Sequence, residues 1–411
     1  MKKFLFGTAG LLLIAASCSK NEVVEVNQDG NEIQFSVVAN NATKAADIYC
    51  NNNKPSEFTV FAESSDDKTY IDGDKIVSSD GGNTWVNQSG TRFWPNELSV
   101  DFYAVVNGDI KWNVTAEGTA PASIKDFTVP TTVADQKDLL YSVKKGLAKG
   151  ATEADPVGLN FRHALSQIVF QAKNTNENLH VEISGVRIVN VANKNTFTFP
   201  TADTDNELLV DDNHDGSFEG TNYADANWGT WNTLAPETGA AGKTIYPVSF
   251  DKVVVPGKNT NATVVNLTNN VAGEEFNTNA LLLLPQTSNA WDPETVPAPG
   301  FDGNAGNGSY FLVDCAIYNI AGDEFDSAND TPLWGTTEEH QEAAIPVAIN
   351  WEQGKKYIYT FIFGEGGGYD PEDPDPEDPD KPDPVLIPIT FKVTVDDFVE
   401  VPAQNIDMDV L

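Results

Sequence analysis

Histidine is the side chain that most often acts as a general base near neutral pH, and the chain has only four, His163, His180, His214 and His340. None of them has the spacing to another ligand that binds zinc, and none adjoins a nucleophile motif. His163 precedes an apolar run, where a hydrogen-bonded structural role competes with that of a base. The 61 acidic residues are so frequent that any pair could be matched to a glycosidase mechanism. The sequence therefore predicts neither an enzyme nor a cofactor.

One acidic stretch has the residue types of a metal site. Asp211, Asn213 and Asp215 stand at the spacing of oxygen ligands in a calcium loop, and Gly216 follows as the turn residue. The glutamate that should complete such a loop is replaced by Asn222. A weak calcium site and a solvated acidic loop both remain open.

Tryptophans offer a second kind of binding chemistry, because an exposed indole can stack on a sugar ring. Trp85, Trp228, Trp231 and Trp291 lie in or near stretches that read as loops. This pattern leaves open a surface glycan-binding lipoprotein as an alternative function. The same residues could instead fill the ends of a β-sandwich core.

Cys18 is the residue at which covalent chemistry is expected. Two lysines precede an apolar run over residues 4–16, which is too short to cross a bilayer, since a spanning helix needs about 20 residues. The residues 15–18 (AASC) resemble the lipobox of bacterial lipoproteins, in which the cysteine is acylated, commonly with palmitate, after cleavage in front of it. We expect a signal peptide over residues 1–17 and a lipid anchor at Cys18. Cys50 and Cys315 either pair or stay as buried thiols.

The charge balance restricts the partners. The chain has 61 acidic and 25 basic residues and a formal net charge of −36. Binding of nucleic acid and docking on anionic lipid both depend on clustered Lys and Arg. The sequence therefore predicts neither partner. The acidity is typical of a soluble, exported surface protein.

The elements that would carry these residues read as strands. Runs rich in Val, Ile, Thr, Phe and Tyr are separated by Asn, Asp and Gly, which predicts an all-β fold of sandwich or barrel type. The length favours two domains, which we place at residues 45–203 and 204–411. The clearest candidate strands are 33–38, 58–63, 98–106, 167–172, 181–189, 310–318, 356–363 and 387–395.

Both ends of the mature chain carry an alternating strand. Near the N-terminus Ile33, Phe35 and Val37 alternate with polar residues, as a strand with one buried face does. Residues 366–384 are rich in Gly, Asp and Pro and predict an extended acidic tether without a core. A terminal strand follows it, and its apolar face consists of Ile387, Ile389, Phe391, Val393 and Val395.

Several separated motifs follow one another along nearly the whole chain. They are 33–37 (IQFSV), 43–45 (TKA), 93–95 (FWP), 100–104 (VDFYA), 138–141 (DLLY), 161–168 (FRHALSQI), 282–286 (LLLPQ), 351–359 (WEQGKKYIY) and 393–398 (VTVDDF). Together they resemble the fimbrillin (Mfa-like, type V pilin) family of exported Bacteroidales lipoproteins. Phe398 stands where the family usually has Trp. The resemblance implies two tandem transthyretin-like β-sandwich domains. It also implies a pilus subunit or accessory adhesin at the surface of the outer membrane.

The resemblance further implies how such a subunit assembles. In the family a protease cuts after a basic residue and frees the N-terminal strand, and a strand from another subunit takes its place. The matching cut here would fall between Lys44 and Ala45, so that residues 18–44 form a leader with a removable strand. We expect residues 387–395 to be the donor strand, although they could also close their own sheet. The expected partners are other pilus subunits and a host protein or glycan receptor.

Overall fold

The computed structural model describes residues 33–39, 54–115, 118–148, 156–204, 227–234, 243–257, 264–268, 280–292, 308–322, 324–364, 368–374, 382–385 and 389–397. Over these residues the chain consists of β-strands and one short 3₁₀ turn, η1 (Val133–Asp135), which confirms the predicted all-β class. This part of the chain contains no helix with the length and apolar character needed to cross a bilayer.

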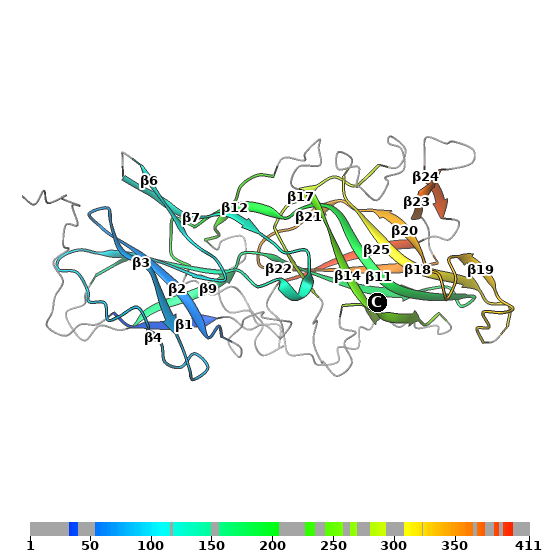
Figure 1. Cartoon of the computed structure of the whole chain (residues 1–411), viewed down its shortest axis with the longest axis horizontal. Coiled ribbons are helices and arrows are strands. Elements are labelled where there is room, and N and C mark those ends of the chain that lie inside the picture. Colours follow the sequence, from blue (N-terminus) through cyan, green and yellow to red (C-terminus); the bar gives the residue numbers. More distant parts are fainter. Residues whose placement is uncertain are drawn as a thin grey trace, which may run out of the picture.

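A seven-stranded sheet forms one end of the elongated molecule (Figure 1). Its strands follow the order β1 (Phe35–Ala39), β9 (Val157–His163), β8 (Leu140–Leu147), β5 (Val100–Val106), β2 (Glu57–Ser64), β3 (Lys68–Val77) and β4 (Val86–Asn87). Neighbouring strands run antiparallel except β1 and β9, which run parallel. The first strand of the chain therefore lies at one edge of this sheet and β4 lies at the other.

A second, four-stranded sheet lies beside the first. Its order is β13 (Thr230–Trp231), β12 (Lys194–Thr198), β7 (Gly118–Thr128) and β6 (Lys111–Thr115). The ring of Phe197 in β12 lies 4.7 Å from that of Tyr141 in β8, centroid to centroid. Side chains of this sheet thus pack on one face of the seven-stranded sheet.

Two further sheets face each other at the opposite end of the molecule (Figure 1). One has the order β14 (Lys243–Val255), β11 (Leu179–Ala192), β18 (Tyr310–Asn319), β20 (Gln341–Pro346), β23 (Gly368–Pro374) and β24 (Pro382–Val385), with β19 (Thr331–Trp334) beside β18. The other has the order β15 (Val265–Asn266), β10 (Ser166–Asn174), β22 (Lys355–Phe363) and β25 (Ile389–Asp397), with β16 (Leu281–Leu283) beside β10. Phe170 of β10 meets Phe311 of β18 at 5.5 Å between ring centroids, which is sandwich packing. A small pair, β17 (Thr287–Ser288) and β21 (Ile349–Asn350), completes the described strands.

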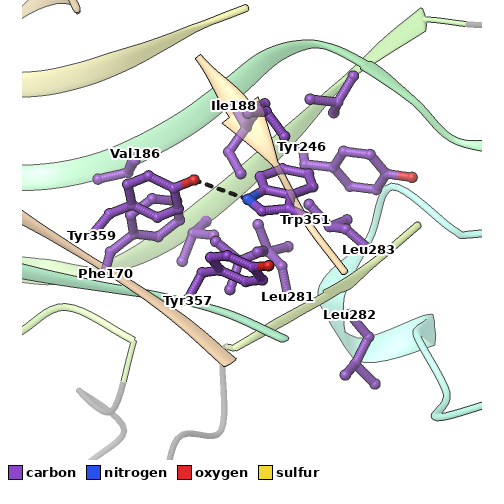
Figure 2. Close-up of a cluster of buried hydrophobic side chains, with 14 of the residues drawn as sticks. Phe170, Val186, Ile188, Tyr246, Leu281, Leu282, Leu283, Trp351, Tyr357 and Tyr359 are labelled. Atoms are coloured by element: carbon purple, nitrogen blue, oxygen red, sulfur yellow. Dashed lines mark hydrogen bonds between the residues drawn. The ribbon is translucent and has the colours of Figure 1, made fainter. Parts of the chain in front are cut away.

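The buried apolar side chains form two main clusters. The N-terminal core lies on one face of the seven-stranded sheet, and side chains of β1 belong to it. The central core joins the other face of that sheet to the interior of the sandwich. Figure 2 shows part of the central core, where the Trp351 indole nitrogen donates a 2.9 Å hydrogen bond to the Tyr359 hydroxyl. Because this core is continuous, the two ends of the molecule share one packed interior.

Two features differ from what the composition suggests. Within the acidic segment 366–384, which is predicted to be a tether, β23 and β24 pair with each other, and Tyr369 pairs with Ala344 of β20. β24 is the edge strand of its sheet, where proline is tolerated, and the two prolines of β23 lie beyond Tyr369, its only residue paired with β20. Sheet membership also changes between β9 and β10, ahead of the boundary predicted at residues 203 and 204. The division into two transthyretin-like domains stays a prediction.

Candidate functional site

The first described strand, β1, pairs with β9 on one side. The two strands pair in parallel from Phe35 opposite Val157 to Ala39 opposite Phe161. The Val157 amide donates a 2.7 Å hydrogen bond to the Gln34 carbonyl just before β1 begins. The strand therefore adds to the edge of an existing sheet, and no other described strand of this sheet lies beyond it.

The predicted apolar face of this strand is buried. Ile33, Phe35 and Val37 are only 4%, 7% and 5% exposed and belong to the N-terminal core. The Phe35 ring meets Phe58 and Phe102 edge-on, at centroid distances of 6.2 and 6.0 Å. Edge-to-face contacts add about 0.5–1.5 kcal/mol each to the area that such rings bury. The alternation read from the sequence thus places the correct three side chains in the core.

A backbone contact holds the start of this strand from the other side. The Ile33 amide donates a 2.8 Å hydrogen bond to the carbonyl of Arg92. The Arg92 guanidinium in turn binds Asp74 through Nε at 2.7 Å and Nη2 at 2.8 Å. Asn87 donates a third hydrogen bond to Asp74, at 2.8 Å. Burial alone would raise the pKa of the Asp74 carboxyl, but these hydrogen bonds and the Arg92 charge outweigh it, and the pKa is lowered.

The C-terminal strand lies at the edge of the sandwich. β25 pairs antiparallel with β22, from Ile389 opposite Phe363 to Asp397 opposite Lys355. In β22 the residues Tyr357, Tyr359, Phe361 and Phe363 are buried in the central core. β25 therefore closes the sheet of its own chain, which is the second of the two arrangements that the sequence allows. Its use as a donor to another subunit stays a prediction.

Several predicted site residues lie outside the described part of the chain. They are the lipidation residue Cys18, the processing residues Lys44 and Ala45, the first donor residue Ile387, and the calcium candidates Asp211, Asn213 and Asp215. These assignments therefore remain predictions. Among the residues that the structure does describe, no group of three His, Cys, Asp or Glu side chains could hold a metal ion.

His163 has a structural partner. Its Nδ1 lies 2.7 Å from Oδ2 of Asp138, whose side chain is fully buried. The pair joins the end of β9 to the segment before β8, since Asp138 is two residues ahead of Leu140. This is the structural role that the sequence left open beside catalysis.

A serine and a histidine that are far apart in sequence meet on the sandwich sheet that contains β11, β18 and β20. The Ser184 hydroxyl lies 2.7 Å from Nδ1 of His340 and 2.6 Å from a carboxylate oxygen of Asp314. The carboxylate can only accept, so the hydroxyl proton points to Asp314 and the His340 nitrogen must donate to Ser184. In this arrangement His340 cannot serve as the base that deprotonates Ser184. Sequence reasoning missed the cluster because β11, β18 and β20 have to pair before its members meet.

The tryptophans considered for sugar stacking pack against the protein. Trp85 is half-buried against the N-terminal core, and Trp228 and Trp231 are half-buried against the central core. Trp291 is fully buried. Trp85, Trp228 and Trp231 thus keep part of their surface exposed, and the glycan-binding alternative stays a prediction.

Cys315 is a free thiol, fully buried in β18. Burial, together with the neighbouring Asp314 carboxylate, raises the pKa of the Cys315 thiol far above its usual range. The reactive thiolate is therefore absent at neutral pH. This residue acts as a small apolar side chain of the core.

Comparison with known proteins agrees with this architecture. The model of a family described as fimbrillin-like matches residues 42–373. A fimbrial protein from Bacteroides vulgatus has a similar structure, with a TM-score of 0.50 and 14% identity over 90% of this chain and 100% of that one. The tip fimbrial protein Mfa3 from Porphyromonas gingivalis aligns with a TM-score of 0.29 and 10% identity, over 88% of this chain and 99% of that one. No curated protein matches the sequence. With a family match over most of its length, the chain belongs to the fimbrillin-like family.

Proposed function

We propose that this chain is a cell-surface pilus subunit or accessory adhesin that assembles by strand replacement. Membership of the fimbrillin-like family supports the coarser part of this statement, a pilus subunit or adhesin at the cell surface. The finer part, assembly by strand replacement, rests on one observation, the position of β1. This strand precedes every other described strand, lies at a sheet edge, and buries three apolar side chains in the N-terminal core.

Loss of such a strand leaves a defined acceptor. The backbone groups of β9 that now pair with β1 would lose their partners. The core residues Phe58, Phe102 and Phe161 would lose an apolar cover, since all three belong to the cluster that β1 completes. A sheet edge with unpaired backbone groups and an apolar face binds an added strand, which is β-augmentation.

The proposed processing follows from where β1 lies in the chain. Cleavage between Lys44 and Ala45 would separate β1 from β2, which begins at Glu57. The cut falls in none of the described strands, so the other strands of the seven-stranded sheet would keep their connections. The lipid anchor at Cys18 would leave with the same fragment, and the cut subunit would be free to join a polymer.

We assign the role of donor to the C-terminal strand of a neighbouring subunit. In β25 the positions 389, 391, 393 and 395 are apolar and alternate with polar ones, as in β1. The strand lies at a sheet edge and follows the acidic segment 366–384. It could therefore leave its sheet without disturbing an interior strand.

Limited trypsin digestion of the chain without its signal peptide tests the proposal. Mass spectrometry should find a new N-terminus at Ala45, and size-exclusion chromatography should then resolve a series of oligomers. The matched control is Lys44→Gln, which removes the cleavage site, and this variant should stay monomeric under the same digestion. A chain that is cut after Lys44 and remains monomeric would overturn strand replacement.

A further inference from the structure

A short segment after β4 links the two edges of the seven-stranded sheet by hydrogen bonds. This segment, residues 88–94, is called the strap. It begins along β3, where the Gln88 amide donates a 2.9 Å hydrogen bond to the Lys75 carbonyl. It then reaches the opposite edge, where the Arg92 carbonyl accepts the hydrogen bond from Ile33. The start of β1 is therefore held between β9 and the strap.

The strap is fixed to β3 by side-chain contacts. The Arg92 guanidinium forms two hydrogen bonds with Asp74, a geometry that defines direction as well as distance. The Asp74 side chain is 4% exposed and that of Arg92 is 40% exposed, so the carboxylate end of the pair is shielded from solvent. The Tyr70 hydroxyl donates to the Phe93 carbonyl, and Trp94 is buried in the N-terminal core.

A β-bulge directs Asp74 toward the strap. Along β2 and β3 the pairing shifts by one residue, because Val60 faces Asp74 while Phe61 faces Asp72. The extra residue is Gly73, whose φ of +81° suits glycine and strains other residues. Bulges commonly re-aim a side chain in this way. The Asp74–Arg92 pair is thus built into the backbone of β3.

A second hold matters for this strand because β1 and β9 share only five residue pairs. Those pairs join β1 to one neighbour, since no other described strand of the sheet lies on its far side. The Arg92 carbonyl gives the start of the strand a hydrogen-bond partner on that side. Any backbone amide in this position can donate to it, so the contact holds a strand without selecting its sequence.

The geometry points to the strap, held by Asp74 and Arg92, as a clamp on the start of the strand that occupies the β9 edge. The occupant is β1 in the intact chain and, after cleavage, a strand from another copy that enters in the same direction. The second half of this inference rests on the proposed strand replacement, and the first half does not. Asp74 and Arg92 are positioning residues, because they act through the Arg92 carbonyl.

Hydrogen exchange on the intact, uncut chain tests the first half. Asp74→Asn keeps the volume of the side chain but removes its charge, and charged hydrogen bonds are the strong ones. The Ile33 amide should exchange about tenfold faster in this variant. The amides of β10, which has strands on both sides, report global opening and should not change. Arg92→Lys, which cannot form the two-point contact, is a second variant and should act in the same direction.

A neighbouring ion pair provides the control. Lys75 and Glu57 lie 2.7 Å apart on the same strand pair, but their side chains are 48% and 57% exposed. Lys75→Ala should leave the exchange of the Ile33 amide unchanged, because exposed pairs contribute little. The inference is overturned if Ile33 exchanges at the wild-type rate in Asp74→Asn, or if it accelerates only together with the amides of β10.

A peptide of residues 387–397, which contains the proposed donor strand, tests the second half. It is added to wild-type chain and to Asp74→Asn chain, both cut after Lys44, and its dissociation is followed by fluorescence. Dissociation should be about tenfold faster from the variant, for the same reason as the exchange. Equal rates would overturn the role of the strap after cleavage. If the peptide binds neither protein, strand replacement itself fails, and the exchange data on the uncut chain still decide the role of the strap.

Discussion

Replacing Phe35 with alanine removes the largest side chain that β1 places in the N-terminal core. The ring is 7% exposed and has edge-to-face contacts with Phe58 and Phe102. Burial of a phenylalanine contributes about 1.5–3 kcal/mol, and each aromatic contact adds about 0.5–1.5 kcal/mol. Because β1 is an edge strand whose site can relax, we expect a loss near the lower end of the range for Phe→Ala, about 3 kcal/mol.

The loss should appear first as detachment of β1 and only then as global unfolding. A change of about 3 kcal/mol raises the population of a detached strand by about two orders of magnitude, since 1.4 kcal/mol is a factor of ten. The Val157 amide, which donates to the Gln34 carbonyl, reports this event. Its hydrogen exchange should accelerate in Phe35→Ala, while amides of β10 keep their protection.

Ser36→Ala is the matched control, because Ser36 lies on the same strand but its side chain belongs to neither core. It should change the exchange of Val157 by less than about twofold, as surface substitutions usually do. If Phe35→Ala behaves like Ser36→Ala, the side chains of β1 do not hold it in place. If instead every amide accelerates equally, β1 is part of the global folding unit and is not separable from it.

Three further changes have defined outcomes. Phe391→Asp sets a charge opposite a fully buried residue of β22 and should prevent oligomers after cleavage, as seen by native gel, while export and lipidation continue. Trp351→Phe removes the buried hydrogen bond to Tyr359 and should lower the free energy of unfolding by about 1–3 kcal/mol in urea, whereas Trp334→Phe, whose indole bond is exposed, should change it little. The folded-state pKa of Asp74 is lowered, so its stabilisation is complete above the unfolded value of about 3.9 and is lost as the pH falls through the folded value. The difference in unfolding free energy between wild type and Asp74→Asn should therefore shrink as the pH falls below about 4 in urea titrations.

Alternation of apolar residues was sufficient to identify β1 and its buried face. It identifies a face because the side-chain period of a strand is two residues. It does not identify a partner, and the parallel neighbour of Phe35 is Val157, which is remote in sequence. The parallel pairing of β1 with β9 is visible only in the folded structure.

Other parts of the site depend on backbone detail that residue types do not encode. The Asp74–Arg92 pair requires the bulge at Gly73, and a single glycine in a strand pattern does not specify where a bulge will aim its neighbour. The acidic segment shows a further limit. Its Asp and Pro content predicts an extended tether without a core, and it does not predict that β23 and β24 pair with each other, with β24 at the sheet edge, where proline is accepted.

The positions of the two terminal strands determine what kind of assembly strand replacement would give. β1 lies on β9 in the seven-stranded sheet, and β25 lies on β22 in the sandwich, at opposite ends of the molecule (Figure 1). A contact between the β9 edge of one copy and the β25 strand of the next uses two different surfaces, so it is heterologous and can add further subunits. If two copies instead gave β25 to each other, the two contacts would be related by symmetry and assembly would stop at a dimer. The size distribution after cleavage separates these cases, because a ladder of oligomers requires the open head-to-tail contact and a single dimer peak requires the reciprocal exchange.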